Sequence, residues 1–81
     1  MYKELHNEKV TVLVSTHGDT VLEYNGTLTA ENEYSITLSN VDIGTMLLNI
    51  QKGIFGGNVT MYKDGVDKVI INKKYIISCY R

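Results

Sequence analysis

The sequence predicts a mostly β protein, a small bent antiparallel barrel of about five strands. Proline is absent from all 81 residues, and six tyrosines and many valines, isoleucines and threonines favour extended structure. Short apolar runs alternate with turn residues along the chain. The clearest example is Val69–Cys79, where two β-branched runs flank Asn72-Lys73-Lys74. This pattern indicates a strand, a sharp turn and a short strand that completes the barrel.

Residues 1–81 are expected to form a single small domain, because a chain of this length supports only one thin core. Cys79 is the only cysteine, which excludes a disulfide within the chain and suits a reducing cytoplasm. No apolar run approaches the roughly 20 residues that span a bilayer. Met1–His6 contains no apolar stretch typical of a signal peptide. We therefore expect a cytoplasmic protein with no membrane partner.

The N-terminal third predicts a short helical turn followed by a strand. Tyr2–Asn7 is interpreted as the turn, with Leu5 as its apolar anchor. Val10–Ser15 then alternates, so one face carries Val10, Val12 and Val14. His17-Gly18-Asp19 is typical of a turn, since Gly and Asp accept turn conformations.

The next strand contains an Asn25-Gly26 step that allows two interpretations. Asn-Gly is a strong hairpin signal, but a glycine can also bend one long strand into a barrel wall. Leu28 and Ala30 continue the alternation after Gly26, which favours the bend. Glu31-Asn32-Glu33 is then expected to form a turn.

The third strand has the most regular alternation in the chain. Tyr34–Ser39 predicts a strand with one face formed by Tyr34, Ile36 and Leu38. Asn40–Gln51 suits either a helical turn or a continued strand, and Gly44 with the flanking strands favours an extended conformation.

The glycine-rich segment Gly53–Gly57 is expected to be either a flexible hairpin tip or a loop that contacts a partner. It carries Ile54 and Phe55, which are costly to expose to water unless another surface covers them. Asn58–Tyr62 then predicts a strand, and Lys63-Asp64-Gly65 predicts a turn before the final strands.

Catalytic, metal and cofactor signals are weak, so the sequence predicts a protein that is not an enzyme. Ser15, Thr16, His17 and Asp19 crowd into one turn, which is not the geometry of a catalytic triad. The histidines and Cys79 have no metal-ligand spacing. Gly53–Gly57 lacks the Gly-Lys-Ser/Thr ending of a phosphate-binding loop. We expect no catalytic residue, no metal and no cofactor.

The formal net charge of −1 excludes a general attraction to nucleic acid, so RNA binding would need a local patch. The basic candidate is Lys73-Lys74, with Lys68 and Arg81 nearby in sequence. One interpretation is that these lysines only solvate a turn.

The chain resembles a divergent bacterial or mobile-element member of the Sm-like family, and two of its segments carry the resemblance. Glu8–Ser39 resembles the family's first signature, with an alternating strand, a glycine turn, a bent strand with Gly26-Thr27-Leu28, an acidic turn and a third strand. Asp67–Cys79 resembles the second, an apolar triplet, a tight polar turn and a short last strand. The resemblance implies a head-to-tail homo-oligomeric ring that holds single-stranded RNA, with Asn72-Lys73 at the loop that lines its pore. In that arrangement Asn72, Lys73 and Lys74 would contact phosphates or base edges, and Tyr34 or Tyr75 would stack on a base.

The chain departs from the family pattern at four places. Gly18 and Gly26 are further apart than in the typical member, which implies a longer first hairpin. The family's RNA-contacting Asn in the third strand falls near Ile36, and the Arg-Gly of many members is Asn72-Lys73 here. Residues 40–66 exceed the usual connection, which predicts an extended hairpin or an extra strand pair.

The alternative hypothesis is an SH3-like module that binds a protein partner rather than nucleic acid, through Ile54, Phe55 and the apolar sheet edge at Ile76.

Overall fold

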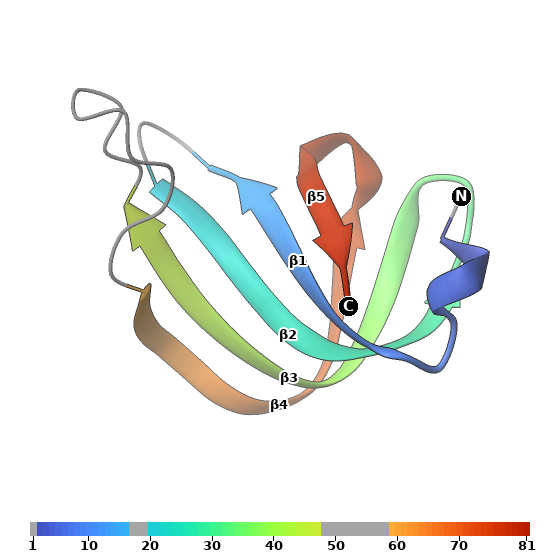
Figure 1. Ribbon diagram of the computed structural model, residues 1–81, viewed down its shortest axis with the longest axis horizontal. Coiled ribbons are helices and arrows are strands. Elements are labelled where there is room, and N and C mark those ends of the chain that lie inside the picture. The colour runs from blue at the N-terminus through green and yellow to red at the C-terminus, as the bar shows by residue number, and fades with distance from the viewer. Residues whose placement is uncertain (1, 17–19, 48–58) are drawn as a thin grey trace.

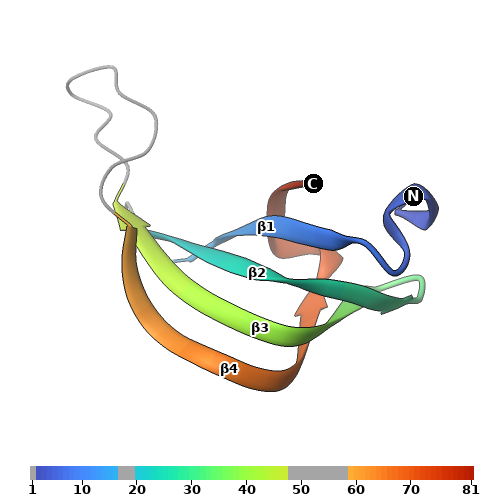
Figure 2. The same ribbon diagram turned by 60° about the horizontal axis from the view of Figure 1, so that its bottom comes forward.

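Five antiparallel strands form one sheet in the order β4-β3-β2-β1-β5. The computed structural model describes residues 2–16, 20–47 and 59–81. Its elements are η1 (Lys3–Leu5), β1 (Lys9–Ser15), β2 (Thr20–Glu31), β3 (Ser35–Leu47), β4 (Val59–Asn72), η3 (Lys73–Tyr75) and β5 (Ile76–Tyr80). The long strands curve strongly, so the sheet curls on itself (Figures 1 and 2). The predicted mostly β, bent barrel-like fold is confirmed.

The N-terminal segment forms the expected short turn, the 3-10 helix η1, and is attached to the middle of the chain. The Asn7 N–H donates to the carbonyl oxygen of Leu28 at 2.7 Å, and the Leu28 N–H donates to that of Glu8 at 3.0 Å. Tyr2 and Leu5 pack against the core. None of the helices in the described segments is long and apolar enough to cross a membrane.

Strand β2 passes through Asn25-Gly26 without turning, which confirms the bend. The register of β2 against β3 shifts between Asn25 and Thr27. An irregularity of this kind lets a strand bend. Gly26 is buried at this crossing. A Cβ atom at Gly26 would lie 2.9 Å from the carbonyl oxygen of Ser39, so only glycine allows this close approach.

The turn predicted at Lys63-Asp64-Gly65 is wrong, because β4 is continuous from Val59 to Asn72. Val41 pairs with Val66 and Ile43 with Lys63, so two residues of β4 lie opposite Asp42 alone. The glycine therefore serves a bulge rather than a turn. Gly65 has a φ of 63°, and its N–H donates to Asp42 Oδ1 at 3.0 Å.

The extended conformation favoured after Asn40 is confirmed as far as Leu47, where β3 ends. Strands β3 and β4 stay paired up to Met46 and Val59, so an extended hairpin lies within 40–66 as expected. Residues 48–58 lie outside the described segments, and with them the flexible segment Gly53–Gly57, Ile54 and Phe55.

The core lies inside the curl of the sheet and follows the alternation in the sequence. Its buried cluster is Val10, Val12, Val14, Leu28, Ile36, Leu38, Val41 and Ile71. The prediction that Tyr34 shares the buried face of Ile36 and Leu38 is wrong. Tyr34 lies before the start of β3 and is 71% exposed. Leu13 and Val21 are also buried but lie outside this cluster, which the alternation did not predict.

The last segment, Val69–Cys79, forms the predicted strand, turn and strand. The turn η3 carries the chain from β4 at one edge of the sheet to β5 at the other, where β5 pairs with β1. Ile71 is 5% exposed and Ile76 packs against the core. This segment therefore leaves β4 and β5 as the two edge strands of the sheet.

Candidate functional site

Two turns that are far apart in the sequence meet at one end of the sheet. One connects β2 to β3 at residues 32–34, and the other is η3. The backbone N–H of Lys73 donates to the carbonyl oxygen of Tyr34 at 2.8 Å. This bond places Tyr34 beside the turn that carries the other residues proposed from the sequence for RNA contact. We call Tyr34, Asn72, Lys73, Lys74 and Tyr75 the two-turn surface.

Asn32 organises the first turn. Its Oδ1 accepts the backbone N–H groups of Tyr34 and Ser35, each at 2.8 Å, and its own N–H donates to the carbonyl oxygen of Ser35 at 2.9 Å. An asparagine that bonds the backbone two and three residues ahead fixes a tight turn. The turn leaves the Tyr34 ring exposed to solvent.

Asn72 organises the second turn in the same way. It is the N-cap of η3, and its Oδ1 accepts the backbone N–H of Lys74 at 3.0 Å. The carboxamide oxygen is therefore used by the turn, and the amide NH₂ is the group that Asn72 offers to a ligand. Asn72 itself is exposed.

The two lysines of the turn have different surroundings. Lys74 is exposed, and its Nζ lies 5.0 Å from the centroid of the Tyr75 ring, within the range of a cation–π contact. Lys73 instead points back over the fold and forms an ion pair with the Glu31 carboxylate. The exposed fractions of these two side chains are only 20% for Lys73 and 16% for Glu31.

Glu31 connects three parts of the chain. Its Oε2 accepts from Lys73 Nζ, and its Oε1 accepts the backbone N–H of Tyr2 at 3.0 Å. The hydrogen bond from Lys73 holds the pKa of the Glu31 carboxyl below its usual value, against the opposing effect of partial burial. Lys73 Nζ also lies 5.8 Å from the centroid of the Tyr2 ring. Sequence reasoning treated Glu31 only as a turn residue and missed this bridge.

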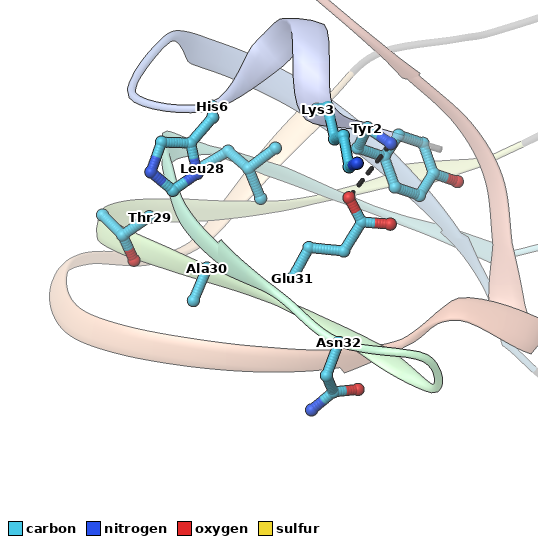
Figure 3. A pocket seen from close by; sticks show the side chains of 8 residues that line it. All are labelled: Tyr2, Lys3, His6, Leu28, Thr29, Ala30, Glu31 and Asn32. Atoms are coloured by element: carbon cyan, nitrogen blue, oxygen red, sulfur yellow. Dashed lines mark hydrogen bonds between the residues drawn. The ribbon is translucent and has the colours of Figure 1, made fainter.

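A groove lies beside Glu31, between the N-terminal segment and the end of β2 (Figure 3). The figure shows the Leu28 side chain between His6 and Lys3, with Thr29, Ala30 and Glu31 below them in the view. The residues that line it are Tyr2, Lys3, His6, Leu28, Thr29, Ala30, Glu31 and Asn32.

The two edge strands expose apolar side chains. Ile70 on β4 is 67% exposed, and Ile77 on β5 is 48% exposed. Ile76, the residue of β5 proposed from the sequence, is partly buried against the core, so its neighbour Ile77 is the more accessible. Ile54 and Phe55, the other proposed partner contacts, lie outside the described residues.

Within the described residues, no group of three or more His, Cys, Asp and Glu side chains could hold a metal ion. Burial raises the pKa of the Cys79 thiol, and the Glu31 carboxylate raises it further, so the reactive thiolate is disfavoured. His17 and Asp19, for which the sequence predicted a turn, are not among the described residues.

Comparisons with protein-family models, with curated proteins and with solved structures gave no match for this chain.

Proposed function

We propose that this chain is an Sm-like RNA-binding protein that assembles as a homo-oligomeric ring and holds single-stranded RNA at the two-turn surface. The observation that carries the proposal is the meeting of the two turns through the Lys73 N–H and the Tyr34 carbonyl oxygen. It places aromatic rings, an amide and lysines on two turns that contact each other.

The chemistry of this surface suits single-stranded RNA. An exposed ring such as Tyr34 can stack on an unpaired base, an interaction worth about 1–3 kcal/mol per base. Lys74 can contact phosphate, and the Asn72 amide can donate to a base edge or a phosphate oxygen. One copy offers too few cations for tight binding, since the net charge of the chain is −1. A ring repeats the surface, and a single RNA that contacts several copies gains affinity through effective concentration.

The edges of the sheet support the ring. Strands β4 and β5 are different edges at opposite ends of the strand order, which is what head-to-tail pairing between copies requires. Unpaired edges that carry apolar side chains favour strand addition from another chain, and Ile70 and Ile77 are exposed there. Pairing of β4 from one copy with β5 from the next would cover both.

Light scattering coupled to size exclusion tests the proposal, with and without short oligo-U and oligo-A RNA. We expect an oligomer whose mass is a whole-number multiple of the 9.1 kDa chain mass. Its mass should increase by that of the bound RNA when RNA is added. A 9.1 kDa species at high micromolar concentration would reject the ring. A ring that takes up neither RNA would reject RNA binding.

A second function, an SH3-like module that binds a protein without nucleic acid, is favoured by one observation. Ile36, which falls near the family's RNA-contacting Asn, is apolar and completely buried, so it cannot contact a base. This module would form no complex with either RNA and would capture its partner through the sheet edge. The light-scattering measurement with added RNA therefore separates the two functions.

A further inference from the structure

Lys73 is the cation of the two-turn surface whose charge is already balanced inside the protein. Its ion pair with Glu31 lies largely out of solvent, and Glu31 is also held from the other side by the Tyr2 N–H. A phosphate that contacts Lys73 must therefore take it from a carboxylate that the fold holds in place.

We propose that Glu31 is an internal competitor for RNA phosphate, so that the Lys73–Glu31 pair holds back binding at the two-turn surface. This inference rests on the proposed function and concerns its regulation. In the free protein Lys73 would contribute no phosphate contact, and Lys74 would be the cation of the turn that RNA meets first. Weakening the ion pair would make a second cation available to RNA.

The physical basis is the release of counterions. Each phosphate that a free lysine neutralises in a single strand adds about 0.7 to the slope of log affinity against log salt. A lysine that exchanges one carboxylate for one phosphate changes no net pairing and adds little to that slope. The salt dependence of RNA binding therefore shows whether Lys73 contacts phosphate.

Glu31→Gln tests the inference with little disturbance, because glutamine keeps an oxygen that can accept the Tyr2 N–H while it removes the charge opposite Lys73. The matched control is Glu33→Gln, which makes the same change of charge at an exposed residue of the turn that follows Glu31. Fluorescence anisotropy with labelled oligo-U across a salt series measures both affinity and slope. We expect Glu31→Gln to bind more tightly than the control, with a slope steeper by about 0.7 for each copy of the chain whose Lys73 contacts the RNA. Its advantage over the wild type should then shrink about 2.6-fold per contacted copy between 50 and 200 mM salt.

The double variant Glu31→Gln, Lys73→Gln keeps the test decisive if the single variant folds poorly. It removes both charges of the pair, and it should bind oligo-U with the affinity and salt slope of the wild type. A shallower slope in the double variant would mean that Lys73 already contacts phosphate in the wild type, which would overturn the inference.

The outcomes separate this inference from the proposed function. Suppose that the wild type binds RNA and that Glu31→Gln and Glu33→Gln gain the same affinity for oligo-U with unchanged salt slopes. The gain then comes from the change in net charge, which overturns the competitor role of Glu31 and leaves the proposed function standing. If neither the wild type nor Glu31→Gln binds RNA, both the proposed function and the inference are rejected.

Discussion

A Cβ atom at Gly26 would lie 2.9 Å from the carbonyl oxygen of Ser39 and 3.0 Å from Val41 Cγ2. The close approach of β2 to β3 at this point is what lets β2 curve around the core. The side chain of any other residue would push the two strands apart. The curvature in turn positions the end of β2, where Glu31 meets Lys73.

Gly26→Ala should therefore destabilise the protein by about 1–3 kcal/mol, the usual cost of forcing extra atoms into a packed site. The free energy of unfolding from urea denaturation measures this cost. Thr27→Ala is the control, since Thr27 is the next residue of the same strand and is only partly buried. A Gly26→Ala variant as stable as the wild type would mean that the strands can separate without loss.

Two adjacent residues of β4 allow core packing and edge pairing to be tested separately. Ile71 is 5% exposed and belongs to the core, whereas Ile70 is 67% exposed on the edge strand. Ile71→Ala should cost about 2–5 kcal/mol of unfolding free energy because it leaves a cavity. Ile70→Ala should leave the stability of a single copy nearly unchanged and lower the mass of the oligomer.

Urea denaturation and light scattering on the two variants check this contrast. An Ile70→Ala variant with the full oligomeric mass would mean that the β4 edge does not pair through this residue. Equal destabilisation by both variants would contradict the burial difference on which the prediction depends.

Tyr34 gives the most direct test of base stacking. Its exposure and the backbone bonds of its turn mean that its ring contributes little to folding. Tyr34→Ala should weaken oligo-U binding by about 1–3 kcal/mol for each base that it stacks, with unchanged thermal stability. Tyr34→Phe keeps the aromatic face and should bind nearly as the wild type does. Equal losses in both variants would indicate a hydroxyl contact instead of stacking.

Local patterns predicted much of this fold because alternation reports which face of a strand is buried. Val10, Val12, Ile36 and Leu38 are buried as the alternation predicted. The same reasoning placed a turn at Gly65, because a glycine next to an aspartate has the same local signature in a turn and in a bulge. Only pairing with β3, which depends on distant residues, decides between them.

The candidate site was predictable only in part, for a related reason. Asn72, Lys73 and Lys74 are recognisable as a polar turn between β-branched runs, and Tyr34 as an aromatic residue beside another turn. The contact between Lys73 and Glu31 joins residues 42 positions apart, and no local pattern encodes it. Its consequence, that one of the two lysines is neutralised, could come only from the fold.

The lowered pKa of Glu31 predicts a loss of stability in acid. Because the folded-state pKa lies below the usual 4.5, the carboxylate stabilises the fold above about that pH, and this contribution is lost as the pH falls through the lowered value. The main cause is the hydrogen bond from Lys73, so Lys73→Met should remove most of the same contribution. Urea denaturation of the wild type and both single variants, Glu31→Gln and Lys73→Met, over a series of acidic pH values measures the effect. The stability advantage of the wild type over each variant should narrow as the pH falls, and a constant difference would show that the ion pair does not lower the pKa of Glu31.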